Sequence, residues 1–569
     1  MRLMVNDNCC VCSNCSKACP TAAPYYDGDK IAIDHNKCMQ CGSCIESCML
    51  GAIYDADDQA AAPEIHAPAE MEADLCVIGC GAAGMIAAAR AAEAGKSVIL
   101  LEKGKGVSGS TPYATGLRMM DSKWEREAGI PSRTQKMIDS AVKNTGGTLD
   151  NQLITNVMHA LPGFFDWCCE WDNPEEYFEL KNNPFGELTV DCIDSGHGAG
   201  IYVSAKLPKR LVDLGVKVMA YTAAREFILD GGRITGVRAE DTGGEVVVKA
   251  NDILIATGSL INCPELLDKV EPGYAGAFTR RYGHRIYTLT GDGVLMAQRA
   301  GIPINYEKIA IAYIGHLCMP VDMQGIHFGR PIDTEMLCQI DKKEAVRVNL
   351  RGERWINEDF QGNIAPAMVR QPLAASFTVM DHDLLMKIPE LPGDVRPGEP
   401  MMPGMGLTPG AVYGKPVDLD KLHEFAELKG KHLLIADTLE ELAGKMGVPE
   451  ESFVKTIIEY NTACREGKDK AFGKAAEYLH PVEKAPFYAF STFLAADGAF
   501  GGIEVNPDMQ VLGRDGAIEN LYAAGDVCSS YYALGDGRKN TIINDFSWAV
   551  ASGFIAGNAI AAKRTGVPQ

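Results

Sequence analysis

Two runs of cysteines near the amino terminus have the spacing of iron–sulfur ligands. Both runs follow the pattern C-x2-C-x2-C-x3-C, and they consist of Cys9, Cys12, Cys15 and Cys19 and of Cys38, Cys41, Cys44 and Cys48. Three closely spaced thiolates hold three corners of a cubane, while the fourth cysteine of a run reaches across to the other cluster. The spacing therefore predicts two 4Fe-4S clusters, one on Cys9, Cys12, Cys15 and Cys48 and the other on Cys38, Cys41, Cys44 and Cys19.

Zinc is the alternative metal for these cysteines, but zinc ribbons place two C-x2-C pairs apart and do not need four cysteines in each run. Nine of the 19 cysteines lie within the first 48 residues, which is too uneven for a disulfide scaffold. Residues 1–55 resemble bacterial two-cluster ferredoxins, including Gly51-Ala52-Ile53-Tyr54, although Met49 stands where the second proline usually does. The resemblance implies a small α+β ferredoxin-like domain, in which Cys10 is out of register and is no ligand.

A dinucleotide-binding motif follows a proline-containing linker at residues 56–70. Residues 74–78 form an apolar run of strand length, Gly79, Gly81 and Gly84 come next, and an alanine-rich helical stretch follows. These glycines allow a tight turn, a close backbone approach to a pyrophosphate, and close helix–strand packing. Glu102 ends a second apolar run 18 residues after Gly84, where it can accept a hydrogen bond from a ribose hydroxyl.

Three later segments indicate which dinucleotide is bound: Ile255-Ala-Thr-Gly258, Thr290-Gly-Asp-Gly293 and Asn520-Leu-Tyr-Ala-Ala-Gly525-Asp526. With the glycine motif, they resemble the flavoprotein family of fumarate reductase and succinate dehydrogenase, which includes 3-ketosteroid dehydrogenases and gut-bacterial alkene reductases. The resemblance covers about residues 71–569. It implies an α/β Rossmann-like FAD-binding domain at 71–307 and 499–569, with an inserted α+β cap domain at 308–498 and its helical part around 450–473.

The same resemblance implies the residues that hold FAD. They are Gly79, Gly81, Ala82, Ala83, Gly84, Glu102, Lys103, Ser110, Thr111, Ala256, Thr257, Gly258, Asp292, Gly525 and Asp526. Residues 104–120 contain no histidine, so the histidyl–flavin bond of membrane-bound fumarate reductases is not available there. We therefore expect FAD to be bound non-covalently.

The substrate residues of fumarate reductases are mostly missing from the matching positions. Those enzymes use an arginine after an Asn-Glu pair as proton donor, and two histidines and another arginine for the substrate carboxylates. After Asn357-Glu358, the donor's place falls at about Gly362, and of the carboxylate ligands only the last arginine has a counterpart, Arg538. Each charge-assisted hydrogen bond in such a site is worth about 1.5–3 kcal/mol. Fumarate is therefore not the expected substrate.

Three tyrosines remain as candidates for the chemistry: Tyr313, Tyr531 and Tyr532. A phenol can polarise a neutral carbonyl or return a proton, and Tyr532 falls close to a tyrosine that binds the substrate ketone in ketosteroid dehydrogenases. The alternative for each tyrosine is a packed aromatic ring. Arg538 has the alternatives of anchoring the flavin diphosphate or pairing with Asp536, and Arg354 is expected to be a structural ion-pair partner of Glu358.

Clusters carry single electrons, whereas FAD accumulates two and can pass them on as hydride. The combination predicts an anaerobic ene-reductase that takes electrons from a protein such as ferredoxin or flavodoxin and reduces an activated C=C bond in an enone, enoate or steroid-like small molecule. A dehydrogenase that passes electrons to ferredoxin or quinone is the first alternative. An electron-transfer subunit of a larger complex is the second, although a relay needs no water-excluding cap.

The composition is compatible with this function. Lys+Arg 54 against Asp+Glu 75 gives a net charge of −21, which disfavours binding to nucleic acid or anionic lipid. No apolar run reaches the ~18 to 20 residues of a membrane helix, and the amino terminus lacks the apolar region of a signal peptide. We expect a cytoplasmic protein without a membrane span. The sequence is also compatible with a homo-oligomer.

Overall fold

The structure is a computed structural model. It describes residues 3–5, 15, 23–26, 31–38, 44–45, 52–56 and 69–563, apart from residues 105, 108, 115, 118, 145–149, 183–187, 194–198, 242–243, 271–287, 318–336, 340–342, 360–366, 369, 391–406, 413–416, 429–432 and 529–543. Within these residues, no helix combines the length and the apolar character needed to cross a lipid bilayer.

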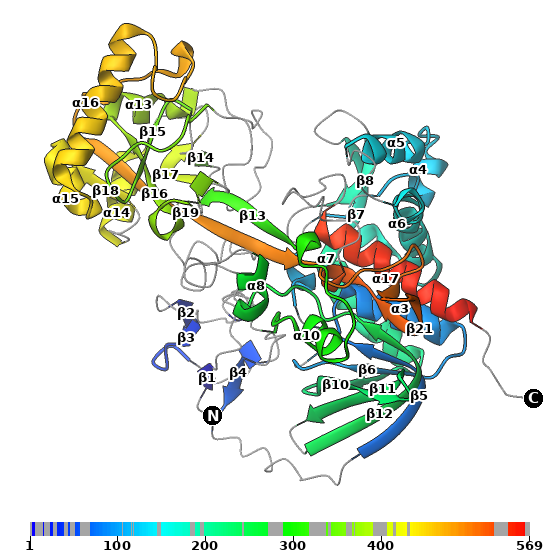
Figure 1. Ribbon diagram of the computed structural model, residues 1–569. Coiled ribbons are helices and arrows are strands. Elements are labelled where there is room, and N and C mark those ends of the chain that lie inside the picture. Colours follow the sequence, from blue (N-terminus) through cyan, green and yellow to red (C-terminus); the bar gives the residue numbers. More distant parts are fainter. Residues whose placement is uncertain are drawn as a thin grey trace, which may run out of the picture.

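An eight-stranded sheet forms the centre of the larger domain (Figure 1). Its strands are β5 (Ala69–Ile78), β6 (Val98–Leu101), β9 (Lys217–Met219), β10 (Ala223–Asp230), β11 (Arg233–Asp241), β12 (Gly244–Ile255), β20 (Gln510–Gly513) and β21 (Gly516–Ala523). The order is β10-β11-β12-β5-β6-β9, and β21 pairs with β12 and β20. Strands β21, β12, β5, β6 and β9 are parallel, so their carboxyl ends meet at one edge.

Helices pack against this sheet, and the most extensive helix–helix contact of the described residues joins α3 (Ala82–Glu93) to α17 (Asp545–Ala562), which lie side by side in Figure 1. A Cβ atom at Gly553 would lie 2.5 Å from the Ala83 carbonyl oxygen, and one at Gly557 would lie 2.8 Å from the Ala87 Cα atom. The other helices of this domain are α4 (Lys123–Glu127), α5 (Thr134–Asn144), α6 (Asn151–Trp171), α7 (Ala199–Asp213), α8 (Pro264–Val270) and α10 (Asp292–Arg299). A separate strand pair is formed by β7 (Phe178–Asn182) and β8 (Leu188–Cys192).

A second domain lies at the far end of two long antiparallel strands, β13 (Ala310–Leu317) and β19 (Phe487–Phe500), as Figure 1 shows. Its sheet adds β15 (Val346–Asn349), β16 (Ala375–Met380) and β18 (Leu433–Ala436), and β14 (Leu337–Gln339) pairs with β17 (Leu407–Val412). Its helices are α13 (His382–Lys387), α14 (Leu419–Leu428), α15 (Leu439–Met446) and α16 (Glu450–Glu466). The predicted cap boundaries, 308 and 498, fall just before β13 and inside β19.

Four buried charged side chains form a network inside this second domain. Arg354 pairs with Glu358 at 2.6 Å and with Asp469 at 2.8 Å, and the Lys474 ammonium group lies 3.4 Å from Glu358. The predicted pairing of Arg354 with Glu358 is confirmed. Lys474 also donates to the Tyr460 hydroxyl at 3.0 Å, and burial lowers the pKa of Lys474 to about 8. Two positive and two negative groups thus compensate one another away from water.

The amino-terminal segment contributes two antiparallel strand pairs, β1 (Leu3–Val5) with β4 (Ile53–Asp55) and β2 (Pro24–Tyr26) with β3 (Ile31–Ile33). Leu3, Ile31 and Ile53 are buried. They belong to the same continuous apolar cluster as the core of the eight-stranded sheet. This segment therefore packs on the larger domain.

The packing of α3 on α17 generates a first prediction. Replacing Gly553 with Ala forces a methyl group against the Ala83 backbone, and we expect a loss of about 1–3 kcal/mol in unfolding free energy, the usual cost of overpacking. Calorimetric melting of the purified protein measures this loss. Gly444, an exposed glycine inside α15, is the matched control, because a Cβ atom there would meet no neighbouring atom within 4 Å. Gly444→Ala is expected to raise the unfolding free energy by up to about 1 kcal/mol. Equal changes in unfolding free energy at both sites would contradict the close packing of α3 on α17.

Candidate functional site

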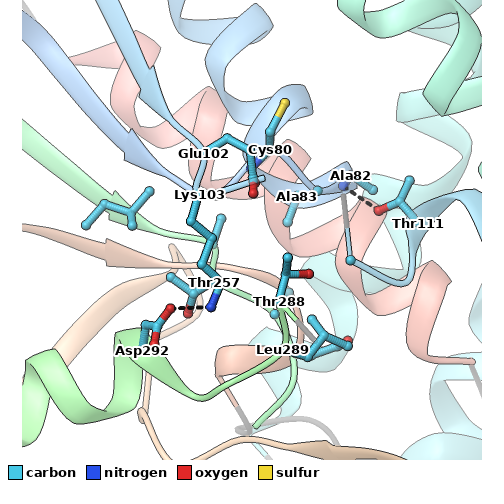
Figure 2. A pocket seen from close by; sticks show the side chains of 18 of the residues that line it. Cys80, Ala82, Ala83, Glu102, Lys103, Thr111, Thr257, Thr288, Leu289 and Asp292 are labelled. Atoms are coloured by element: carbon cyan, nitrogen blue, oxygen red, sulfur yellow. Dashed lines mark hydrogen bonds and ion pairs between the residues drawn. The ribbon is translucent and has the colours of Figure 1, made fainter. Parts of the chain in front are cut away.

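A pocket lies at the edge where the parallel strands end (Figure 2). Its walls come from the β5–α3 turn, the ends of β6 and β12, residues 109–111, the start of α10 and the turn after β21. Fourteen of the fifteen residues predicted to hold FAD line this pocket. The exception is Gly84, whose place in α3 is a packing position. Residues that are far apart in the sequence are therefore brought together around one cavity.

Two glycines explain why the β5–α3 turn can close so tightly. Gly79 has φ +108, and a Cβ atom there would lie 2.3 Å from the Ala256 carbonyl oxygen. A Cβ atom at Gly84 would lie 2.0 Å from the Gly79 carbonyl oxygen. Any side chain at either position would push the turn away from β12 or push α3 away from the turn. Both glycines thus fix the point at which α3 begins.

The amino terminus of α3 opens into the pocket. Its N-cap residue is Gly81, which has no side chain to cap the helix, and the first turn carries no acidic residue. The Ala82 N–H donates to the Thr111 hydroxyl at 2.9 Å, as Figure 2 shows. A helix start of this kind presents N–H groups and a positive dipole end, so it favours a bound phosphate group.

Glu102, at the end of β6, is buried and already holds two backbone groups. Its carboxylate accepts from the Cys80 N–H at 2.8 Å and from the Gly104 N–H at 2.6 Å, one on each oxygen. Each carboxylate oxygen has a further lone pair that can accept from a ligand hydroxyl. Burial raises the pKa of the Cys80 thiol far above its ordinary value, and the Glu102 charge raises it further, so this cysteine is an unreactive wall of the pocket.

An ion pair closes the other side of the pocket. The Lys103 ammonium group lies 2.5 Å from Asp292, the first residue of α10, and donates to the Thr290 hydroxyl at 2.6 Å. The Thr290 hydroxyl in turn donates to Asp292 at 2.9 Å. Figure 2 shows Lys103 reaching from the end of β6 to Asp292. The pair joins two elements of the wall and neutralises the charges of both side chains.

Two hydroxyl groups of the wall have no protein partner in the described part of the chain. The Thr257 and Thr288 hydroxyl oxygens are buried and make no hydrogen bond there. A buried hydroxyl without a partner costs about 1–3 kcal/mol, and both residues line the pocket. A polar ligand in the pocket would supply the missing partners.

The turn after β21 forms the floor of the pocket and rests on α17. Gly525 has φ +77 and packs against Ala83, where a Cβ atom would lie 3.2 Å from the Ala83 Cβ atom. The Gly525 N–H donates to the Ser552 hydroxyl, and the Trp548 indole N–H donates to the Gly525 carbonyl, both at 2.9 Å. The buried Asp526 follows, and its carbonyl accepts from the Gly501 N–H at 2.7 Å.

The predicted chemical residues fall mostly beyond what the structure describes. Tyr531, Tyr532 and Arg538 lie outside the described residues. Tyr313 lies on β13 opposite Ala496 of β19, and its side chain is outside the description. These four assignments therefore stay predictions.

Five of the eight predicted cluster ligands also lie outside the described residues. Of the other three, Cys15 and Cys44 are buried and Cys38 is half-buried. Among the residues that the structure describes, no three His, Cys, Asp or Glu side chains are gathered in a way that could hold a metal ion. The cluster assignments stay predictions as well.

The sequence did not single out several residues of the wall. Thr288 and Leu289 come directly before Thr290-Gly-Asp-Gly293, so a longer reading of that motif would have included them. Thr222 enters the wall because its N–H donates to the Glu102 carbonyl at 2.8 Å. No sequence motif marks that contact.

Comparisons with known proteins agree with this geometry. A family model described as FAD binding domain matches residues 74–536. Vinyl phenol reductase from Lactiplantibacillus plantarum is 28% identical over 474 residues, which cover 80% of this chain and 89% of that protein. Urocanate reductase from Eggerthella lenta is 26% identical over 489 residues, which cover 82% of this chain and 72% of that protein.

Among solved structures, the open conformation of a flavocytochrome c3 fumarate reductase has the same fold, with a TM-score of 0.61 and 22% sequence identity over 86% of this chain and 78% of that one. A 3-ketosteroid-Δ4-(5α)-dehydrogenase from Rhodococcus jostii has a TM-score of 0.56 at 21% identity, over 87% and 97% of the two chains. Because the family match covers most of the sequence, this chain belongs to the FAD binding domain family and is a flavin-dependent oxidoreductase.

Proposed function

We propose that this protein reduces an activated C=C bond in a small molecule, using FAD that receives single electrons through two 4Fe-4S clusters. The observation that carries the proposal is the pocket at the strand ends, which combines a helix start, a buried carboxylate and two hydroxyls without partners among the described residues. The two relatives named as reductases, of a vinyl phenol and of urocanate, support the C=C bond as the site of reaction.

The residues of the pocket fit FAD one part at a time. The start of α3 receives the diphosphate, while Glu102 accepts from a ribose hydroxyl with the lone pairs that Cys80 and Gly104 leave open. The glycine at 525 lets the floor approach the cofactor without a side chain. Bound FAD supplies two-electron chemistry. The protein holds and orients it and keeps water away from it.

The Thr257 hydroxyl provides a direct test of this assignment. Thr257→Val keeps the shape of the side chain and removes a hydroxyl that has no partner among the described residues. We expect the FAD dissociation constant, measured by fluorescence titration of the FAD-free protein, to rise about 3- to 10-fold, the value of one hydrogen bond. The melting temperature of the FAD-free protein should stay the same or rise. Unchanged FAD affinity would remove Thr257 from the binding site.

The cysteine runs provide the electron entry in this proposal. Their segment shares one apolar cluster with the core of the flavin domain, so a cluster carried there would be held against the same body as the FAD pocket. We expect an external one-electron carrier protein, such as ferredoxin or flavodoxin, to deliver electrons to this segment. The sequence shows no second glycine motif that would bind a nicotinamide directly.

Iron content tests the cluster assignment. The purified protein is expected to contain about 8 iron atoms per chain, because each of the two cubanes holds four. Cys44→Ser is expected to contain about 4, because only the cluster that Cys44 holds loses a ligand. Anaerobic purification with iron analysis and electron paramagnetic resonance of the reduced protein measure both values. Cys10→Ser is the matched control, since Cys10 lies beside a ligand but out of register, and it should keep all the iron. Zinc in place of iron would contradict the proposal.

The proposed substrate class follows from the missing carboxylate ligands and from the tyrosines that are present. Apart from Arg538, the carboxylate-binding set of fumarate reductases is missing at the matching positions, while Tyr313, Tyr531 and Tyr532 are present. A phenol suits a neutral carbonyl or a carbon that needs a proton. We assign Tyr532 as the proton donor for the carbon next to the activating group, once hydride has reached the far carbon.

Reoxidation of the reduced protein tests both the reaction and the donor. After anaerobic reduction with dithionite, enones, enoates, steroids or vinyl phenols should reoxidise the flavin, as followed by its absorbance. Tyr532→Phe should slow this step about 100-fold, the usual contribution of a general acid, without changing flavin content. If no compound of these classes reoxidises the flavin, the proposed reaction is wrong. Unaltered rates in Tyr532→Phe would leave the reaction standing and remove this tyrosine.

A further inference from the structure

Three helices begin beside the same short stretch of chain and contact its described residues 111, 114 and 116. The Ala82 N–H at the start of α3 donates to the Thr111 hydroxyl at 2.9 Å. The Gly200 N–H at the start of α7 donates to the Ala114 carbonyl at 3.0 Å. At the start of α17, the Asn544 side-chain amide donates to the Gly116 carbonyl at 2.8 Å. The start of each helix thus makes a hydrogen bond to one residue of this stretch.

This stretch continues directly from the wall of the FAD pocket. Gly109, Ser110 and Thr111 line the pocket. The stretch has little freedom on the α7 side, since a Cβ atom at Gly200 would lie 1.9 Å from the Thr111 carbonyl oxygen. Its far end accepts a hydrogen bond from Asn544, a residue that does not itself line the pocket.

Asn544 performs two separate tasks with its two side-chain atoms. The oxygen accepts from the Ser547 N–H at 2.8 Å and so caps α17. The nitrogen donates to the Gly116 carbonyl. A cap alone would be served equally well by serine or aspartate, which rank with asparagine at this position. An aspartate carboxylate can only accept, and a serine hydroxyl has one oxygen on a shorter side chain, whereas the asparagine amide carries its acceptor and its donor on two separate atoms.

We infer that Asn544 is a positioning residue of the flavin site, which ties Gly116, in the chain that follows the pocket wall at residues 109–111, to the helix that supports the pocket floor. The same helix holds that floor through Trp548 and Ser552. The chain that follows the wall and the floor of the pocket are therefore both held by α17, which would keep the distance between wall and floor fixed when FAD binds. The inference rests on FAD binding in the proposed function and does not depend on the clusters or on the substrate.

Variants at Asn544 separate the two tasks. Asn544→Ser and Asn544→Asp keep an oxygen that can cap α17, but both lose the bond to Gly116, and aspartate also places a negative charge against that carbonyl. We expect the FAD dissociation constant to rise about 3- to 10-fold in Asn544→Ser and further in Asn544→Asp. The visible spectrum of the bound flavin should shift in both variants. The melting temperature of the FAD-free protein should stay near that of the unaltered protein.

Thr438→Ala is the matched control, because Thr438 caps α15 in the cap domain through the Glu441 N–H at 3.1 Å. It should lower stability as the loss of a cap does and leave FAD affinity and spectrum unchanged. An Asn544→Ser protein with unaltered FAD affinity and spectrum would overturn the inference. If the unaltered protein bound no FAD, the proposed function would fail instead, so the two failures are distinguishable.

Discussion

The close approach of backbone to backbone around α3 is the constraint on which the rest of the flavin domain depends. On one side, Gly84 brings the helix to within contact of the Gly79 turn, and on the other Gly553 and Gly557 bring α17 against Ala83 and Ala87. Neither interface has room for an additional carbon atom. The start of α3 is consequently held from both sides, and the groups that face the pocket are positioned by packing rather than by their own flexibility.

The charged groups around the pocket separate into an ion pair, two further carboxylates and a helix start. Lys103 and Asp292 neutralise each other, while the Glu102 carboxylate receives two backbone N–H groups. The carboxylates of Glu102 and Asp526 can accept hydrogen bonds from hydroxyl groups, whereas the positive end of α3 favours an anionic group. An environment of this kind suits a ligand with a localised anionic part and an otherwise neutral, hydroxyl-rich body, which describes a dinucleotide.

Much of the pocket could be predicted because its residues belong to short local motifs. Gly79, Gly84 and Glu102 have positions dictated by a turn, a helix and a strand end, and such elements are encoded by nearby residues. Contacts between distant segments were harder to predict. Arg354 and Glu358 are close in the sequence, so their pairing could be expected, whereas the approach of Asp469 to Arg354 and of Lys474 to Glu358 depends on where the chain after α16 packs.

The helical part predicted at 450–473 extends too far at its carboxyl end. The structure ends α16 at Glu466, because Gly467 takes φ 64 and stops the helix. The residues assigned to substrate chemistry have no strong local motif around them. Tyr532 and Arg538 were assigned by resemblance alone, and they lie outside the described residues.

The way in which the cap is inserted bears on how this protein can diversify. Strands β13 and β19 leave and re-enter the flavin domain as hydrogen-bonded neighbours, and the cap beyond them has two apolar clusters of its own. Exchanging the inserted unit therefore requires only that two adjacent strand ends be rejoined. Selection or engineering can therefore replace the inserted unit while the flavin domain keeps its architecture.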